Sequence, residues 1–132
     1  MTEKVGTTVV HRRYVPYAHA HYAGNLVDGA YSLALFGDAA TEVCIRTDGD
    51  EGLFAGYSGV VFHAPVHAGD VVEVTAVVVR VGNRSRTVEF TCHVVCRGVA
   101  DVSVSAARVL DPPILATSAT GTVVVPAPVT PR

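Results

Sequence analysis

The sequence has few charged residues and no long apolar run. Asp, Glu, Lys and Arg make up 17% of its 132 residues, and hydrophobic residues make up 49%. The formal net charge of −2 excludes the basic footprint of nucleic-acid-binding proteins and the polybasic patch of membrane-surface proteins. No apolar stretch approaches the roughly 20 residues of a transmembrane helix, and the polar N-terminus lacks a signal-peptide pattern. We therefore expect no nucleic-acid or membrane partner.

Cysteine is also scarce. The chain has 3 cysteines, an odd number that excludes complete disulfide pairing. Cys92 and Cys96 lie four apart in a strand-like pattern, so about 13 Å separates them on one face, which is too far for a disulfide. We expect three reduced, buried thiols in a cytoplasmic protein.

Several common functional motifs are absent. There is no Walker A loop, no dinucleotide fingerprint and no Gly-x-Ser-x-Gly elbow, so covalent catalysis by Ser32 or Ser58 is not expected. The acidic segment 48–52 lacks the spaced ligands of an EF-hand, and we interpret it as a solvated turn. His19 and His21 lie two apart, but no third ligand stands at metal-site spacing. The sequence therefore predicts no metal site.

The length of the chain suits a single domain. A chain of 132 residues can bury a core of its own, and we expect one domain over residues 1–132 with a frayed tail at 126–132. A chain this short and apolar often buries further surface by self-association. We therefore expect a homodimer or a larger homo-oligomer.

Only one long stretch has helical periodicity, from Asn25 to about Ile45. Its polar residues fall within one arc of roughly 120° when successive residues are placed 100° apart. These polar residues are Asp28, Tyr31, Ser32, Asp38, Glu42 and Arg46. Either Asn25 or Asp28 would cap the N-terminus of the helix. The pattern predicts a tightly packed helix with one polar side.

β-Branched or alternating residues predict five strands. They span residues 5–14, 53–63, 70–81, 85–97 and 114–125. Residues 16–24 are expected to form a loop, Gly82-Asn83 a hairpin turn, and the weakly patterned segment 98–113 a connection. One strand, one helix and four strands that pair with their chain neighbours predict an α+β fold. In this fold, known as the hot-dog, an antiparallel sheet wraps around one central helix.

Two carboxylates on the predicted helix are candidates for chemistry. Asp38 and Glu42 lie four apart, so their carboxyl groups can reach a common point. Their repulsion would raise the pKa of one of them, which suits acid–base catalysis, and the pair could also hold an ammonium group. A solvated stripe is the alternative interpretation. Beside the start of the helix, His21 could donate a hydrogen bond or transfer a proton.

The hairpin turn offers a second candidate. Residues 82–86 combine backbone donors with the guanidinium groups of Arg84 and Arg86, which together could grip a phosphate. An ordinary surface hairpin is the alternative. The pattern itself does not choose between these two interpretations.

Five ordered blocks of the sequence resemble one enzyme family. They are His21-Tyr22-x-Gly-Asn-Leu-Val-Asp-Gly-Ala, Phe36-Gly-Asp-x-Ala-Thr-Glu42, Asp48-Gly-Asp-Glu-Gly-Leu-Phe54, Ala64-Pro-Val-x-Ala-Gly-Asp70 and Val81-Gly-Asn-x-Ser85. Together they are similar to the β-aminoacyl-CoA ammonia-lyases, hot-dog enzymes that act on 3-aminobutyryl-CoA or β-alanyl-CoA. The similarity runs from about residue 19 to 122. Tyr31 stands where a basic residue is expected, which could signal a changed acyl group.

The resemblance implies an activity. This is the reversible elimination of ammonia from a short β-aminoacyl-CoA, with 3-aminobutyryl-CoA giving crotonoyl-CoA, and without a cofactor. Either Asp38 or Glu42 would remove the α-proton while the other holds the ammonium group. Backbone N–H groups near Asp28 and Gly29 would stabilise the enolate oxygen.

The resemblance also implies binding residues. Those that would contact the substrate beside the catalytic Asp38, Glu42 and His21 are Tyr22, Asn25, Asp28, Gly29 and Tyr31. Those that would contact the CoA phosphates are Asn83, Arg84, Ser85 and Arg86. Two other functions remain open at this point: a hot-dog acyl-CoA thioesterase, in which a carboxylate activates water, and a non-catalytic acyl-CoA-binding protein.

Overall fold

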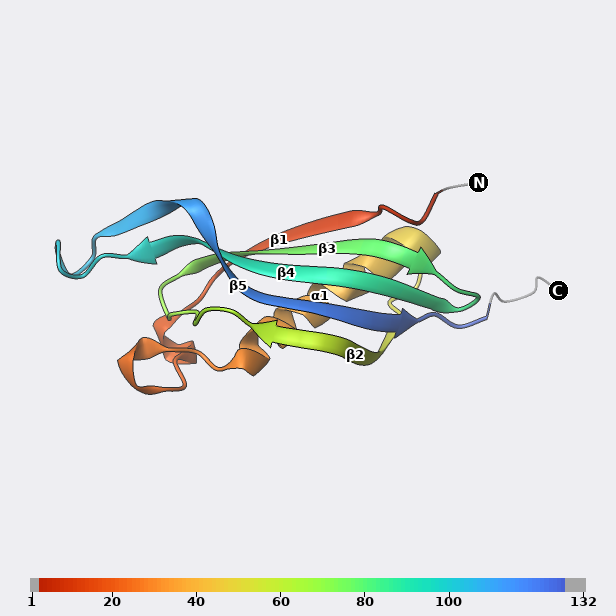
Figure 1. The fold of residues 1–132 in the computed structure, drawn as a ribbon, viewed down its shortest axis with the longest axis horizontal. Helices are drawn as coiled ribbons and strands as arrows, with labels where there is room; N and C mark the ends of the chain where they lie inside the picture. The colour runs from red at the N-terminus through yellow and green to blue at the C-terminus, as the bar shows by residue number, and fades with distance from the viewer. Residues whose placement is uncertain (1–2, 128–132) are drawn as a thin grey trace.

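The computed structural model describes residues 3–127, which form five strands and one long helix. The elements are β1 (Thr8–Tyr14), α1 (Gly29–Asp48), β2 (Leu53–Phe62), β3 (Val71–Val81), β4 (Ser85–Gly98) and β5 (Ala107–Val124), with short 3-10 turns at Tyr17–His19 and Ala23–Asn25. Figure 1 shows α1 lying along one face of the sheet. The predicted α+β hot-dog fold is confirmed.

All strand pairs are antiparallel, in the order β1-β3-β4-β5-β2. The expected pairing of chain neighbours is right for β3, β4 and β5, but wrong for β2, which pairs with β5 at the far edge. The reason is that α1 crosses the sheet between β1 and β2, so these two strands reach opposite edges (Figure 1). Within residues 3–127, β1 and β2 each pair along one side only.

The core lies between α1 and the concave face of the sheet. Phe36 of α1 is fully buried and stacks on Phe90 of β4, with ring centroids 5.0 Å apart. The inward face of β4 carries Val88, Phe90, Cys92 and Val94, as its alternation predicts. Small residues such as Ala39 and Ala40 let the helix approach the sheet closely. This packing fixes which helix positions remain exposed.

The helix begins and ends later than its periodicity predicts. Asn25 has a left-handed φ of 60° and belongs to a 3-10 turn, so it does not cap α1. Asp28 is the cap, and its Oδ1 accepts a hydrogen bond from the backbone N–H of Tyr31 at 3.1 Å. The C-terminus lies at Asp48 because Gly49, with φ 65°, closes the last turn with a hydrogen bond to the carbonyl of Ile45.

The last strand is longer than predicted. The segment 98–113 was expected to be a connection, but residues 107–109 pair with 96–98, so β4 and β5 form an extended arm. Pro112 and Pro113 obscure this strand in the sequence. β2 pairs with β5 only at residues 117–124 of β5. Pro112 and Pro113 lie outside this range, so their missing N–H groups remove no hydrogen bond between β5 and β2. Part of the predicted frayed tail, residues 128–132, lies outside the described residues.

All three cysteines are free thiols. Cys44 and Cys92 are buried, but Cys96, near the outer end of β4, is only partly buried. The prediction of three buried thiols is therefore wrong for Cys96, because β4 continues past the start of α1 at this position. Among the helices of the described chain, none is both long and apolar enough to span a membrane.

Candidate active site

A groove of about 420 Å³ lies at the start of α1. Three of the predicted substrate-binding residues line it: Tyr22, Asp28 and Gly29. The first N–H groups of a helix have no acceptor within the helix, and the helix dipole makes this end partially positive. The helix start can therefore receive the oxygen of a carbonyl group that becomes negatively charged.

His21 lies beside this helix start, as the sequence predicts. Its Nδ1 is 3.8 Å from Oδ2 of Asp28, and its ring packs edge-on against Tyr22 with centroids 4.6 Å apart. The structure thus brings together four of the residues that the sequence analysis placed in the site.

The floor of the groove consists of two buried hydroxyl groups that the sequence analysis did not place together. Oγ1 of Thr117, in β5, lies 3.0 Å from Oγ of Ser32, in the first turn of α1. Phe62, the last residue of β2, and His63, which follows it, complete one wall. The pairing of β2 with β5 brings these residues to the helix start, and no local sequence pattern reveals that pairing.

Asp38 lies elsewhere, at the middle of α1. It is exposed and lines a second cavity, of about 370 Å³, together with His11, Arg12 and Arg13 of β1. The sequence analysis missed His11. Its position in the alternation of β1 could have indicated a side chain that faces the helix, but only the pairing of β1 with β3 sets it beside α1.

Glu42, one helical turn after Asp38, is held by two partners. Its Oε1 lies 2.7 Å from Nε2 of His11, and its Oε2 accepts a hydrogen bond from Nε of Arg46, also at 2.7 Å. These hydrogen bonds, from His11 first and then Arg46, hold the pKa of Glu42 below its ordinary value of 4.5. Because an ionised carboxylate only accepts hydrogen bonds, Nε2 of His11 is the donor in this pair.

The helix separates the two groups of site residues. Asp38 lies nine positions after Gly29, which corresponds to about 14 Å along the helix axis. The carbonyl carbon and the α-carbon of a thioester are joined by one bond. A thioester with its oxygen at the helix start would therefore have its α-carbon out of reach of Asp38 on the same helix.

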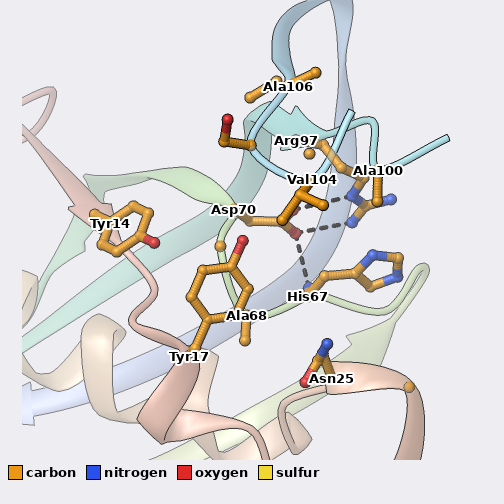
Figure 2. A pocket seen from close by; sticks show the side chains of 15 residues that line it. Tyr14, Tyr17, Asn25, His67, Ala68, Asp70, Arg97, Ala100, Val104 and Ala106 are labelled. Carbon is orange, nitrogen blue, oxygen red and sulfur yellow. Dashed lines mark hydrogen bonds and ion pairs between the residues drawn. The ribbon is translucent and has the colours of Figure 1, made fainter. Parts of the chain in front are cut away.

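Asn25 lines a third and larger cavity, of about 700 Å³, beneath the outer arm of β4 and β5 (Figure 2). Tyr14 and Tyr17 form one side of this cavity, and His67 and Arg97 lie opposite. The structure therefore separates Asn25 from the groove that Gly29 lines.

Asp70 anchors that third cavity. It is fully buried and accepts hydrogen bonds from Nε and Nη2 of Arg97, at 3.0 and 2.9 Å, and from the backbone N–H of His67, at 2.7 Å (Figure 2). Burial, followed by the charge of Arg97, lowers the pKa of His67. Because Asp70 neutralises Arg97, the ion pair joins the segment after β2 to the arm rather than presenting a free charge.

Tyr31, the predicted substrate-binding residue that departs from the pattern of the resembled family, belongs to a small polar cluster. Its hydroxyl lies 2.8 Å from Nδ1 of His19 and accepts a longer hydrogen bond, 3.4 Å, from Nε of Arg13. The cluster joins α1 to β1 and to the short 3-10 turn before the helix. His19 is thus engaged with a tyrosine. Across residues 3–127, no cluster of three or more His, Cys, Asp or Glu side chains could hold a metal ion.

The residues of the predicted phosphate-binding hairpin lie in two different environments. Asn83 and Arg84 are exposed, whereas Arg86 is buried and bonds both oxygens of Asp48, at 3.0 and 2.7 Å, and the carbonyls of Gly82 and Ser85. The ion pair raises the pKa of Arg86 and lowers that of Asp48. In this structure Arg86 supports the fold of the hairpin, and Arg84 presents its charge to solvent.

These features agree with the comparisons to known proteins. The family model described as the thioesterase superfamily matches residues 24–98, which is more than half of the chain, and the chain belongs to that superfamily of hot-dog proteins. A 3-aminobutyryl-CoA ammonia lyase of Acetoanaerobium sticklandii is 51% identical over 107 residues, which cover 81% of this chain and 85% of that protein. Within the superfamily, the chain is therefore a member of the β-aminoacyl-CoA ammonia-lyase family.

Solved structures support the same assignment. The β-alanyl-CoA:ammonia lyase of Clostridium propionicum has a TM-score of 0.87 and 38% identity, with 92% of this chain and 86% of that chain covered. A hexameric hot-dog thioesterase of Campylobacter jejuni is more distant, with a TM-score of 0.71 and 25% identity over 86% of this chain and 79% of that one. The expected resemblance to carbon–nitrogen lyases is confirmed.

Proposed function

We propose that this protein reversibly eliminates ammonia from a short β-aminoacyl-CoA, with 3-aminobutyryl-CoA as the substrate and crotonoyl-CoA as the product. The similarity to a 3-aminobutyryl-CoA ammonia lyase over four-fifths of the chain supports this function. The observation that carries it is the combination, on one helix, of a partially positive start at Gly29 and two carboxylates at Asp38 and Glu42.

The chemistry needs these two features. A base removes the α-proton, the Cβ–N bond breaks with its electron pair going to nitrogen, and a double bond forms between Cα and Cβ while ammonia leaves. The thioester oxygen gains negative charge during this step, and the N–H groups of the first turn of α1 would stabilise it. No electrons are exchanged with another molecule. The proposal therefore includes no cofactor, and CoA enters only as part of the substrate.

The two carboxylates differ in a way that suggests a division of roles. The hydrogen bonds that Glu42 accepts from His11 and Arg46 favour its ionised form, and because each carboxylate oxygen can accept more than one hydrogen bond, Glu42 could also accept one from the ammonium group of the substrate. Asp38 is exposed and lines the adjacent cavity. We therefore assign proton removal to Asp38 and binding of the amine to Glu42.

The distance along α1 makes the proposed site a shared one. Because about 14 Å of helix separates Gly29 from Asp38, the thioester oxygen and the α-proton of one substrate would be served by different protomers. β2 has a partner strand only on its β5 side in the described chain, and it exposes Leu53, Val61 and Phe62. We propose a homodimer that pairs through this edge and forms the basis of a larger oligomer. The similar thioesterases described as hexameric support such an assembly.

The remaining parts of the proposal concern CoA and location. Arg84 and Asn83, exposed on the β3–β4 hairpin, would contact the phosphates of CoA, with Ser85 beside them. The three cysteines in the thiol form support a cytoplasmic location, where thiols stay reduced.

A direct assay tests the activity. Purified protein is incubated with crotonoyl-CoA and ammonium, and the loss of enoyl absorbance and the mass of the aminoacyl-CoA product are recorded. We expect the adduct to form and to revert when ammonium is removed. Release of free CoA thiol without an adduct would identify a thioesterase instead, and tight binding without turnover would identify an acyl-CoA-binding protein.

A mixing experiment tests the shared site. Asp38→Asn and Gly29→Val are each expected to inactivate the homo-oligomer, because each removes one half of every site. If both variants are expressed together with different affinity tags, mixed dimers contain one intact site of two and regain activity. Mixed dimers that stay as inactive as the parent variants would show that both halves belong to one protomer.

A further inference from the structure

One wall of the groove at the helix start is an aromatic ring that depends on a glycine. The ring of Phe62 lies so close to Gly29 that a Cβ atom on residue 29 would be 2.6 Å from its Cε1 and 2.7 Å from its Cζ. Such distances are far below normal van der Waals contact. Glycine at this position therefore allows the ring to lie directly against the first residue of α1.

The ring also lines the groove at the helix start. His63 follows Phe62, with Nε2 2.8 Å from Oγ of Ser118, and Ala64, Pro65 and Val66 then add an apolar wall. The floor is closed by the buried pair of Ser32 and Thr117. A thioester with its oxygen at the helix start would direct its acyl carbons between this floor and the ring.

We propose that Phe62, seated on Gly29, is the residue that limits the length of the acyl group accepted by the site. The inference rests on the proposed function, because it assumes that the groove receives the thioester. A two- or three-carbon extension past the β-carbon meets the ring or must displace it from the glycine. Within the substrate class already proposed, the ring would therefore set the upper limit on the length of the acyl chain.

The exposure of Phe62 makes this role testable without loss of the fold. Phe62 is 56% exposed in the described chain and lies outside the buried core around Phe36 and Phe90, so its loss would bear on the proposed dimer edge rather than on the core. Val61, its neighbour on β2, is similarly exposed at 50% but points to the opposite face of the strand, since successive side chains alternate. Because Val61 and Phe62 both belong to the proposed dimer edge, Val61→Ala is a matched control for any weakening of the dimer.

The experiment compares kcat/KM for ammonia addition to crotonoyl-CoA and to trans-2-hexenoyl-CoA. A hydrophobic pocket discriminates by roughly 10- to 200-fold per methylene, and we expect the wild-type protein to favour crotonoyl-CoA by at least about 100-fold. Phe62→Ala is expected to reduce this preference about tenfold or more, mainly because kcat/KM for hexenoyl-CoA increases. Val61→Ala is expected to leave the preference unchanged.

A second variant checks that the glycine contact is the cause. Gly29→Ala is expected to push the ring into the groove and to lower activity on crotonoyl-CoA, and adding Phe62→Ala to it should restore activity because the clash is then absent. The proposal would be overturned if the ratio of kcat/KM for hexenoyl-CoA to kcat/KM for crotonoyl-CoA were the same in Phe62→Ala and Val61→Ala. Equal losses of kcat/KM on both substrates in Phe62→Ala would also overturn it. Absence of any ammonia addition by the wild-type protein would instead contradict the proposed function.

Discussion

The carboxylate of Asp48, the last residue of α1, receives two hydrogen bonds from the buried guanidinium of Arg86, at 3.0 and 2.7 Å. Nζ of Lys4 approaches the same carboxylate at 2.6 Å. This arrangement ties the end of the helix to β4 and to the segment before β1. An arginine that looks like a phosphate ligand in the sequence is thus used to hold the helix on the sheet.

Replacing Arg86 is expected to affect stability, whereas replacing Arg84 is expected to affect substrate binding. Arg86→Met leaves Asp48 without its main partner in a nearly buried position and should lower the free energy of unfolding by about 3 kcal/mol. Arg84→Met, at an exposed position, should change it by less than about 0.5 kcal/mol but raise KM for the CoA thioester. Urea unfolding and initial rates measure the two effects. Equal stability of both variants would contradict this division.

The pH dependence of this ion pair follows from the direction of its pKa shift. The hydrogen bonds from Arg86 lower the pKa of Asp48 from its ordinary value of 3.8, so the folded state binds this proton less tightly than the unfolded state. The contribution of the pair is therefore fully present above that ordinary value and is lost as pH falls below it. The stability difference between the wild type and Asp48→Asn should be constant from about pH 7 to about pH 5 and shrink below about pH 4.

The two helix carboxylates should produce different kinetic defects. Asp38→Asn removes the proposed base and is expected to lower kcat by about 10²- to 10⁴-fold. Glu42→Gln removes the charge that would hold the amine, so it should mainly raise KM for ammonium in the addition direction. Glu89→Gln, an exposed change on β4, serves as the control. If Asp38→Asn keeps full turnover while Glu42→Gln loses it, the two roles are exchanged.

Asp70 is expected to be a stability residue. Asp70→Asn removes a fully buried charge and leaves Arg97 without its carboxylate, which should cost about 3 kcal/mol in the free energy of unfolding. Asp101→Asn, at the exposed turn of the arm, should change it by less than about 0.5 kcal/mol. Urea titrations followed by circular dichroism make the comparison. Matching urea titration curves for Asp70→Asn and Asp101→Asn would show that the ion pair of Asp70 with Arg97 contributes nothing to the free energy of unfolding.

The cysteines should differ in reactivity. Burial raises the pKa of Cys92 to about 11 and raises that of Cys44 above its ordinary value, so neither thiol forms the reactive thiolate readily. Cys96 is partly exposed. Iodoacetamide at neutral pH should label Cys96 alone in the folded protein and all three thiols in urea, as read by peptide mass spectrometry. Rapid native labelling of the Cys96→Ser variant would contradict the burial of the other two.

Much of the fold could be predicted because it depends on local alternation. The inward residues of β4 and the single helix follow from periodicity, and Asp28 was one of two proposed caps. The position of β2 could not be predicted from pairing of chain neighbours, because it depends on α1 carrying the chain across the sheet. The outer part of β5 was hidden by Pro112 and Pro113, which fit there because this part of the strand lies beyond the paired residues of β2.

The sequence could identify candidate site residues, but it could not predict their positions relative to one another. The sequence identified the helix start and the carboxylates as candidates, yet on one helix they are about 14 Å apart. The partners His11 and Phe62 come from β1 and β2, whose positions depend on long-range pairing. For the same reason, the ion pair of Arg86 with Asp48, 38 positions apart, is not visible in any short motif.

The position of β1 has a consequence for synthesis. Thr8 pairs with Val77 and Tyr14 with Val71, so during synthesis β1 has no partner strand until about sixty more residues have followed it. The chain must close this large loop before β1 is protected, and such non-local pairing slows folding. During translation, the N-terminal segment is therefore an exposed strand that a chaperone or another nascent chain can bind before β3 arrives.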